Sequence, residues 1–353
     1  MTKVRIVTIN VRGLATGNKF VRFCRVVARW ARDGLAHAVC AQEHNLAPNQ
    51  KGPLERLADS FGLHLVISFS ATEGHRGGTF ILSDNRTLPH LRTVHTEPSM
   101  SRAKYEFNAK ELDVASVYAP AGDLSRVDFF SHLKAQLSTH TITGGDWNCV
   151  PDVTLDVKGP NALNYKNRGA AQLGKLMAEL RLEDYRREQL EDEFEHTRKS
   201  PVEGTVATRL DRWYLPTHPD FAEYLWDIHV RSEMVWSEEN SDHQPVLLTI
   251  EPTQGERGSN RETIREDLMF QIKHQSAVKD IAEEVFEKKG GTSKVVKWDR
   301  AMRRIRKYLM DQTRKLKKKE AVECKATKEK LSVLNAKMNA EGVTQADKTR
   351  EAD

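Results

Sequence analysis

The chain has 353 residues, of which 39% are hydrophobic, and its 55 Lys and Arg against 50 Asp and Glu give a net charge of +5. This length is enough for one large domain and an additional segment, and no run of about 18 apolar residues predicts a transmembrane helix. The four cysteines form no CxxC pair. This argues against a zinc site or a disulfide scaffold and for a reducing compartment, the nucleus or the cytoplasm.

The first two thirds of the chain mix strand-like and helix-like segments. Short apolar runs that end in polar residues predict strands over residues 3–9, 36–44, 64–70, 77–83, 112–120, 141–150, 208–216 and 244–252. Apolar residues at helical spacing predict helices over residues 18–34, 126–138 and 167–185. Because hairpins and helices are mixed in this order, we predict an α+β fold in which two β-sheets pack face to face with helices outside.

The composition changes after Pro252, so residues 1–252 are predicted to form one domain. Residues 253–261 form a polar linker, residues 262–340 a charged helical extension, and residues 341–353 a disordered tail. An apolar stripe is predicted in the extension, made of Trp298, Met302, Ile305, Leu309 and Leu316.

The positive charge of the chain is concentrated in this extension. Residues 300–330 hold thirteen Lys and Arg against four Asp and Glu, a net charge of +9, whereas the rest of the chain sums to −4. Such a segment fits either a solvated helix face or a surface that binds the phosphate backbone of a nucleic acid. On the second interpretation the contacting residues are Arg303, Arg304, Lys315, Lys317, Lys318 and Lys319.

The stretch TITGGDWNCVPD, residues 141–152, presents Asp146 and Asn148 two positions apart at the end of a predicted strand. Side chains at i and i+2 of a strand lie on one face, so we expect these two to point together and Trp147 to be turned away. The alternative is a simple turn, because Gly, Asp and Asn all favour turns.

Other predicted strands also end in polar residues. The set comprises Asn10, Glu43, Tyr118, Asp146, Asn148, Asp211, Asp242 and His243. Each residue alone fits a turn, a sheet edge or a solvated charge. Independent explanations of that kind do not predict acids, amides and one histidine at the ends of successive strands.

The chemistry that needs this set is phosphodiester hydrolysis. Glu43 is the best-placed ligand for Mg²⁺, which prefers carboxylate and water oxygens, with Asp242 as a second ligand and Mn²⁺ as the other candidate ion. Asp146 can orient or deprotonate the attacking water. Asp211 can keep His243 protonated by raising its pKa, so that the imidazolium donates to a phosphoryl oxygen. The remaining members can hold phosphate oxygens or the acids themselves: Asn10, Tyr118 and Asn148.

Six motifs, TINVRGL, CAQEH, VYAP, GGDWNCV, TRLDRWYL and SDHQPV, occur in the order of the endonuclease/exonuclease/phosphatase superfamily. Over residues 3–252 the chain resembles the endonuclease domain of non-LTR, LINE-type retrotransposons, which is similar to apurinic/apyrimidinic endonucleases. The segment before TRLDRWYL also resembles that branch. Two departures are Trp147, where Phe or Leu is more usual, and the absence of a second acid just after Asn10, which leans away from a dedicated repair enzyme.

This resemblance implies a four-layered α/β sandwich, Mg²⁺ dependence and nicking of double-stranded DNA to leave a 3′-hydroxyl. It also implies roles for single residues. Asp211 matches the aspartate that supports the histidine, and Thr208 takes the usual Ser/Thr position of the same motif, which we assign to nucleic-acid binding. Glu43 matches the metal-binding glutamate, and Tyr118 matches the tyrosine that contacts the phosphate.

Retrotransposon proteins continue from this domain into a reverse transcriptase, whereas here the chain ends at Asp353 without a Tyr-x-Asp-Asp motif. We therefore expect a truncated element, an excised fragment or a stand-alone protein, with any reverse transcriptase as a separate partner. An abasic-site repair endonuclease and a phosphatase acting on a small phosphorylated substrate remain the alternatives. A silent nucleic-acid-binding protein fits less well, because the acidic set is complete.

Overall fold

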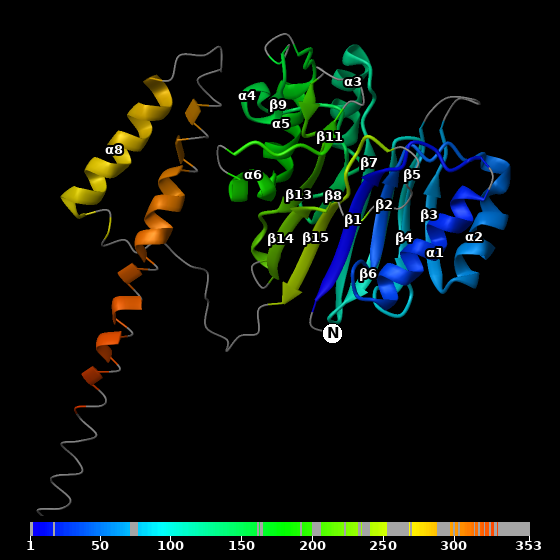
Figure 1. Ribbon diagram of the computed structural model, residues 1–353, viewed down its shortest axis with the longest axis horizontal. Helices are drawn as coiled ribbons and strands as arrows, with labels where there is room; N and C mark the ends of the chain where they lie inside the picture. Colours follow the sequence, from blue (N-terminus) through cyan, green and yellow to red (C-terminus); the bar gives the residue numbers. More distant parts are fainter. Residues whose placement is uncertain are drawn as a thin grey trace, which may run out of the picture. The chain divides into compact units, whose positions relative to one another are not determined.

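The computed structural model divides the chain into two compact units, Met1–Glu256 and Arg257–Asp353 (Figure 1). Within the first unit the structure describes residues 3–252 except 17, 71–76, 161, 163–164, 191–192, 200–205, 222–223, 232–233 and 235–240. Within the second it describes residues 268 and 270–287 and parts of 297–330. The predicted linker and the predicted disordered tail, residues 253–261 and 341–353, lie outside the described residues.

Two six-stranded sheets form the first unit. The first sheet has the strand order β14-β15-β1-β2-β4-β3, with β1 (Val4–Asn10), β2 (Ala38–Gln42), β3 (Leu63–Ser68), β4 (Thr79–Asp84), β14 (Tyr224–Val230) and β15 (Val246–Pro252). The second has the order β10-β13-β8-β7-β6-β5, with β5 (His90–Glu97), β6 (Met100–Phe107), β7 (Lys110–Tyr118), β8 (Thr141–Asp146), β10 (Leu182–Glu183) and β13 (Asp211–Pro216). A small third sheet joins β11 (Arg198–Lys199), β12 (Ala207–Thr208) and β9 (Val157–Lys158).

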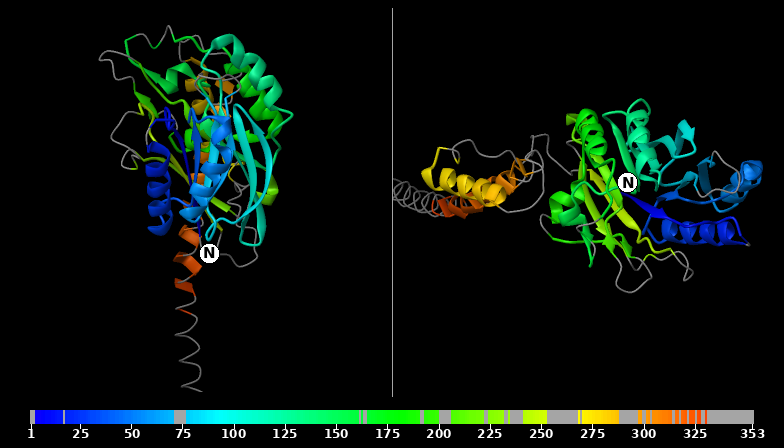
Figure 2. Two further views of the ribbon diagram at one scale, coloured as in Figure 1. Left: turned by 90° about the vertical axis from the view of Figure 1, so that its right-hand side faces the viewer. Right: turned by 90° about the horizontal axis from the view of Figure 1, so that it is seen from above.

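Three apolar layers hold the sheets and helices together. Between the sheets, Ile6 and Ile81 pack in one buried cluster with Val114 and Trp213. The outer faces of the sheets are covered by helices on opposite sides of the sandwich (Figure 2, left). One side carries α1 (Lys19–Arg32) and α2 (Lys51–Ser60), and the other carries α3 (Asp123–Leu133) and α5 (Ala170–Leu180). Shorter helical turns complete the unit: η1 (Pro48–Gln50), α4 (Val153–Asp156), α6 (Tyr185–Leu190) and η3 (Pro219–Phe221).

The predicted four-layered sandwich is therefore confirmed, as are its long apolar strands and its three predicted helices. The sequence prediction missed α2 and the strands β5, β6 and β14. The edge strand β5 is largely exposed along its length, so its sequence shows no buried face that periodicity could reveal. Among the described residues, every helix is too short or too polar to cross a membrane.

The topology places several strand ends at one edge of the sandwich. β1 and β2 are parallel neighbours in the first sheet, and β7 and β8 are parallel neighbours in the second. The hydrogen bond from Asn10 at the end of β1 to Asp146 at the end of β8 shows that the carboxyl ends of both pairs meet at the same edge. β13 runs antiparallel to β8 with Asp211 opposite Asp146, and β15 starts at this edge because it runs antiparallel to β1. Strand direction within each sheet and the packing of the two sheets together gather the polar strand ends.

The second unit contains α8 (Ile272–Glu287) and further helical segments between residues 297 and 330. Its buried side chains include Val285 and Leu309. Of the predicted apolar stripe, Leu309 is buried, Ile305 and Leu316 are half-buried, and Trp298 and Met302 are exposed.

Candidate active site

Asn10 stands at the centre of the polar edge. It ends β1, is almost fully buried, and its Nδ2 donates to Glu43 Oε2 at 3.1 Å and to Asp146 Oδ2 at 3.0 Å. Tyr118, the last residue of β7, donates its hydroxyl to the same Glu43 oxygen at 3.3 Å. One amide therefore connects a carboxylate from each sheet, and the two carboxylates are held with an oxygen of each directed toward the same group.

The local backbone conformation sets the direction of these side chains. Glu43 follows β2 with a φ of +58°, a left-handed conformation that is strained for a residue with a side chain and that recurs at functional sites. Gly145 lets β7 and β8 approach, because a Cβ there would lie 1.9 Å from the Val117 carbonyl oxygen. The glycines of the GGD segment thus serve close packing beside Asp146.

His243 faces Asp146 from the segment before β15. Its Nδ1 bonds Asp211 Oδ2 at 2.8 Å, and its Nε2 lies 3.9 Å from Asp146 Oδ2. Burial by itself would lower the pKa of His243, but the carboxylates of Asp211 and Asp146 outweigh it and raise that pKa to about 9. The imidazole is therefore charged at neutral pH, with Nδ1 donating to Asp211 and Nε2 carrying the other proton.

Asp146 has the opposite balance. Burial raises the pKa of Asp146 to about 6, and the nearby Asp211 carboxylate adds to this rise, while His243 and the Asn10 amide act against it. A carboxyl group with a pKa near neutral pH can exchange a proton during a reaction. Asp146 and His243 therefore combine a carboxyl group that can accept a proton with a cation that can donate a hydrogen bond.

Asn148 reaches the site differently from the prediction. β8 ends at Asp146, and Asn148 adopts a φ of +44°, so strand alternation does not set its direction. Its main-chain N–H donates to Asp146 Oδ1 at 2.9 Å, and its side chain donates to the Ala119 carbonyl at 2.8 Å. Trp147 is turned away into the core, as predicted, where its ring lies against Phe130.

Two arginines that the sequence did not single out hold Asp242. Arg12 Nη1 lies 3.1 Å from Asp242 Oδ1, and Arg198 Nε donates to Asp242 Oδ2 at 2.9 Å. Burial acts to raise the pKa of Asp242, but His243 and the guanidinium of Arg198 outweigh it and lower that pKa. Both arginine side chains remain partly exposed, at 36% and 42%. No spacing rule links Arg198 to Asp242, since they lie 44 positions apart.

Hydroxyl groups support the same residues. Thr197 Oγ1 accepts from the main-chain N–H of Asp211 at 3.0 Å, and Ser241 Oγ accepts from the N–H of His243 at 3.1 Å while donating to the Asn10 carbonyl at 2.6 Å. Thr208, predicted to bind nucleic acid, is buried in β12. Of these supporting hydroxyl groups, only that of Ser241, two positions before His243, could have been singled out from the sequence.

The donor set suits a hard divalent cation. Mg²⁺ takes oxygen ligands and is bound through one or two carboxylates with water completing its shell. Glu43 and Asp146 offer such oxygens around Asn10. Ligand atoms of Asp146, Asp211 and His243 also lie within 4.8 Å of one another. A protonated His243 has no lone pair to offer at Nε2, however, so the Glu43 side of Asp146 is the better metal position.

The basic residues predicted in the second unit are only partly described. Arg303 and Lys317 lie outside the described residues. Arg304 Nη2 donates to Glu284 Oε2 at 2.9 Å, and Lys319 lies 3.8 Å from Glu323 one helical turn away. Lys315 and Lys318 are exposed.

No family model and no curated protein matches the chain. Solved structures do match its fold. The AP endonuclease LMAP from Leishmania major superposes with a TM-score of 0.57 at 15% identity, covering 71% of this chain and 88% of that one. An AP endonuclease from Archaeoglobus fulgidus gives 0.53 at 23% identity, covering 69% and 98%.

The endonuclease domain of TRAS1, a telomere-specific non-LTR retrotransposon, gives a TM-score of 0.48 at 16% identity, covering 71% of this chain and 99% of that one. The likeness to the two AP endonucleases, at 15% and 23% identity, establishes the fold alone. The chain shares with these two endonucleases the α+β sandwich that its motifs predicted.

Proposed function

We propose that the chain is a Mg²⁺-dependent DNA endonuclease that hydrolyses a phosphodiester bond and leaves a nick with a 3′-hydroxyl. The observation that carries the proposal is the pairing of Asp146 with a charged His243 beside the carboxylate of Glu43. Asn10 holds both carboxylates, and Asp211 holds the imidazolium. This is a complete set of groups for attack by water on a phosphate and for stabilising the charge that develops.

Each residue has a place in the reaction. Asp146 orients the attacking water and takes its proton as the water oxygen bonds to phosphorus. His243 donates its Nε2 proton as a hydrogen bond to a phosphoryl oxygen, which stabilises the negative charge of the transition state. The bond from phosphorus to the 3′-oxygen breaks, and the leaving oxygen takes a proton from solvent water. One strand end therefore keeps a 5′-phosphate and the other gains a 3′-hydroxyl. Tyr118 helps to hold Glu43, Asn148 helps to hold Asp146, and both can contact the phosphate.

The divalent cation would be held through Glu43, with Asp146 beside it. When bound, Mg²⁺, or Mn²⁺ in its place, supplies Lewis-acid stabilisation of the phosphoryl charge. Asp242 is the weaker candidate ligand, because each of its oxygens already pairs with a guanidinium.

Double-stranded DNA is the substrate class that the charge distribution favours. Arg12 and Arg198 present partly exposed guanidiniums beside His243, where they can contact phosphates that flank the cleaved bond. The net charge of +9 over residues 300–330 supports a polyanionic substrate over a small molecule. We further propose that the nick is of the kind that LINE-type elements make at a target site, with a reverse transcriptase as a partner.

The direct test compares three substrates, supercoiled plasmid, abasic duplex and an inositol phosphate, with Mg²⁺ or with EDTA. We expect relaxed circles from the plasmid with Mg²⁺ only, and ends that a DNA polymerase can extend, which shows the 3′-hydroxyl. Cleavage of the abasic duplex alone would identify a repair enzyme, and release of inorganic phosphate alone would identify a phosphatase.

Glu43→Ala links the activity to this site. The substitution should abolish nicking, because it removes the main metal ligand. It should change thermal unfolding little, because Glu43 lies at the edge of the sheet. Glu55→Ala is the matched control, since Glu55 is an exposed acid whose neighbour is Lys51 at 4.0 Å. Nicking by Glu43→Ala with the wild-type dependence on Mg²⁺ would contradict the ligand assignment.

A further inference from the structure

A second cluster of ligand-type side chains lies at the end of the sandwich opposite the candidate active site. His140 immediately precedes β8, whose last residue is Asp146, so the length of that strand, on the order of 20 Å, separates the two places. His218 and Asp220 come from the connection between β13 and β14, which leads from the second sheet to the first.

The three side chains converge on one carboxylate oxygen. Asp220 Oδ2 lies 3.2 Å from His140 Nε2 and 3.3 Å from His218 Nδ1, and the two imidazole rings have centroids 4.3 Å apart. Ligand atoms bound to one tetrahedral Zn²⁺ at about 2.0–2.1 Å are separated by about 3.3 Å. The two measured separations match that edge length.

Hydrogen bonds hold one nitrogen of each ring beside the carboxylate of Asp220. His218 Nδ1 accepts from the main-chain N–H of Asp220 at 3.3 Å, so in that arrangement it has no proton to offer Asp220 Oδ2. His140 Nδ1 bonds the hydroxyl of Thr139 at 3.1 Å, which leaves Nε2 as the atom that faces Asp220. A cation bound here would replace the hydrogen bond between His140 Nε2 and Asp220 and the long N–H contact at His218 Nδ1. The Thr139 hydroxyl on the second nitrogen of His140 is the usual kind of support for a metal-binding histidine.

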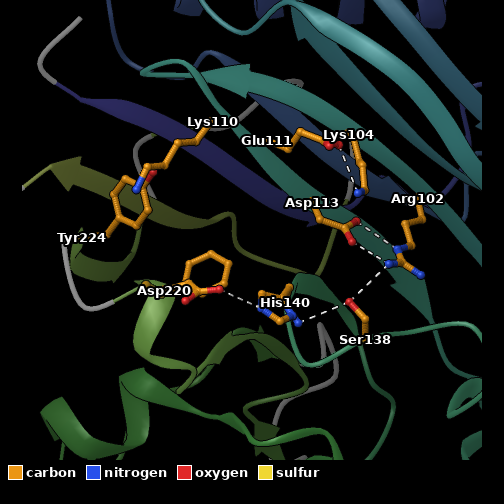
Figure 3. A pocket seen from close by; sticks show the side chains of 10 residues that line it. Arg102, Lys104, Lys110, Glu111, Asp113, Ser138, His140, Asp220 and Tyr224 are labelled. Carbon is orange, nitrogen blue, oxygen red and sulfur yellow. Dashed lines mark hydrogen bonds and ion pairs between the residues drawn. The ribbon is translucent and has the colours of Figure 1, made fainter.

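A cavity of about 550 Å³ adjoins the cluster and is lined by His140 and Asp220 among others. Figure 3 shows these two side chains directed toward one another at one side of the cavity. Across it, Arg102 pairs with Asp113 at 2.5 Å and Lys104 with Glu111 at 3.0 Å. These ion pairs occupy the nearby acids, and the cavity gives water or another small ligand access to the cluster.

We propose that His140, His218 and Asp220 bind a transition-metal dication of the Zn²⁺ class. Imidazole ligands suit Zn²⁺ and its neighbours, whereas Mg²⁺ prefers oxygen ligands alone, so this site and the catalytic site select different ions. The absence of a CxxC pair excludes only a zinc site built from cysteines close together in sequence, whereas this site uses histidine and aspartate ligands from distant segments. The bound ion would tie the segment before β8 to the connection between the two sheets and thereby stabilise the fold.

The test measures Zn²⁺ binding to the full chain, stripped of metal by a chelator, in excess Mg²⁺, and needs no nuclease activity. We expect His218→Ala and His140→Ala each to bind one Zn²⁺ fewer than the wild type by calorimetric titration. A hundredfold excess of Zn²⁺ over Kd should raise the melting temperature of the wild type by about 5 °C, and this rise should be lost in both variants.

His229→Ala is the matched control, because His229 is a partly exposed histidine that pairs with one carboxylate, Asp227 at 2.9 Å. It should keep the full Zn²⁺ stoichiometry, and His243→Ala should keep this site as well. His218→Cys, which retains a zinc ligand, should restore the lost equivalent. Equal Zn²⁺ stoichiometry in the wild type and His218→Ala, or an equal rise in melting temperature, would overturn the proposal.

Discussion

Adjacent residues of β13 belong to two buried charge clusters with opposite character. Asp211 points toward His243 and Asp146, where the carboxylates outnumber the cations. Arg212 points toward Asp156, which also contacts Arg209 and Arg187. Because side chains alternate along a strand, one short segment supplies both a reactive site and a stabilising network.

The two clusters show how charge balance decides what a buried carboxyl group can do. Burial raises the pKa of Asp146 to about 6 because one imidazolium compensates it incompletely. Burial would also raise the pKa of Asp156, but the guanidiniums of Arg209, Arg212 and Arg187 hold that pKa well below its usual range. Asp156 is thus a fixed anion that structures the core, whereas Asp146 can exchange a proton.

The two clusters also lose their contributions to stability at opposite ends of the pH scale. The lowered pKa of Asp156 gives stability above about pH 4, the value of an unfolded aspartate, and this is lost as the pH falls. The raised pKa of His243 gives stability that is complete below about pH 6.5 and is lost as the pH rises through about 9.

The largest expected effect is the loss of catalysis when the reactive cluster is broken. His243→Ala and Asp211→Ala should each lower kcat for plasmid nicking by about a thousandfold or more, and the double variant should lose little beyond either one. Residues that act as one unit are not additive. Single-turnover rates of the four proteins give the comparison, and losses that multiply would disprove the pairing of Asp211 with His243.

Breaking the stabilising cluster should instead unfold the protein. Asp156→Ala removes one of the two carboxylate partners of the fully buried Arg212, the other being Asp184 at 3.2 Å, and should lower the free energy of unfolding by about 3–5 kcal/mol. Glu195→Ala is the control, because it breaks the less buried pair with Arg186 at 2.5 Å and should cost about 1 kcal/mol or less. Urea denaturation measures both, and equal losses would show that burial does not distinguish the pairs.

The pH dependence of nicking sharpens the contrast further. Rates should rise as Asp146 loses its proton near pH 6 and fall as His243 loses its proton near pH 9. Asp211→Asn removes the negative charge that favours the imidazolium, so the falling limb should move toward neutral pH. A pH–rate profile of the residual activity tests this, and an unmoved falling limb would exclude His243 as its source.

Exposed charges should have the smallest effects, and these should appear in binding rather than in stability. Replacing both Lys315 and Lys318 by Gln should make the slope of log K for DNA against log salt shallower by about 2. Lys51→Gln, an exposed lysine of the first unit, should leave that slope unchanged. If the double variant keeps the wild-type slope and affinity, the basic segment is a solvated helix face.

The sequence by itself determined the sandwich and most members of the reactive cluster. Apolar runs located most of the buried strands, because a strand covered on both faces is largely apolar, and β1 and β8 end in Asn10 and Asp146. Polar groups at the ends of successive strands are not explained by packing of the strands themselves. Pattern alone therefore located them, although not the exposed strand β5.

Only the tertiary structure decided which residues meet across the chain. Arg198 reaches Asp242, Thr197 holds the main chain of Asp211, and His140 approaches Asp220, in each case across segments far apart in sequence. The same holds for the difference between Asp146 and Asp156, two aspartates ten positions apart whose pKa values diverge because the fold places different cations beside them. Residue type sets the chemistry a side chain can perform, and its folded neighbours set its charge.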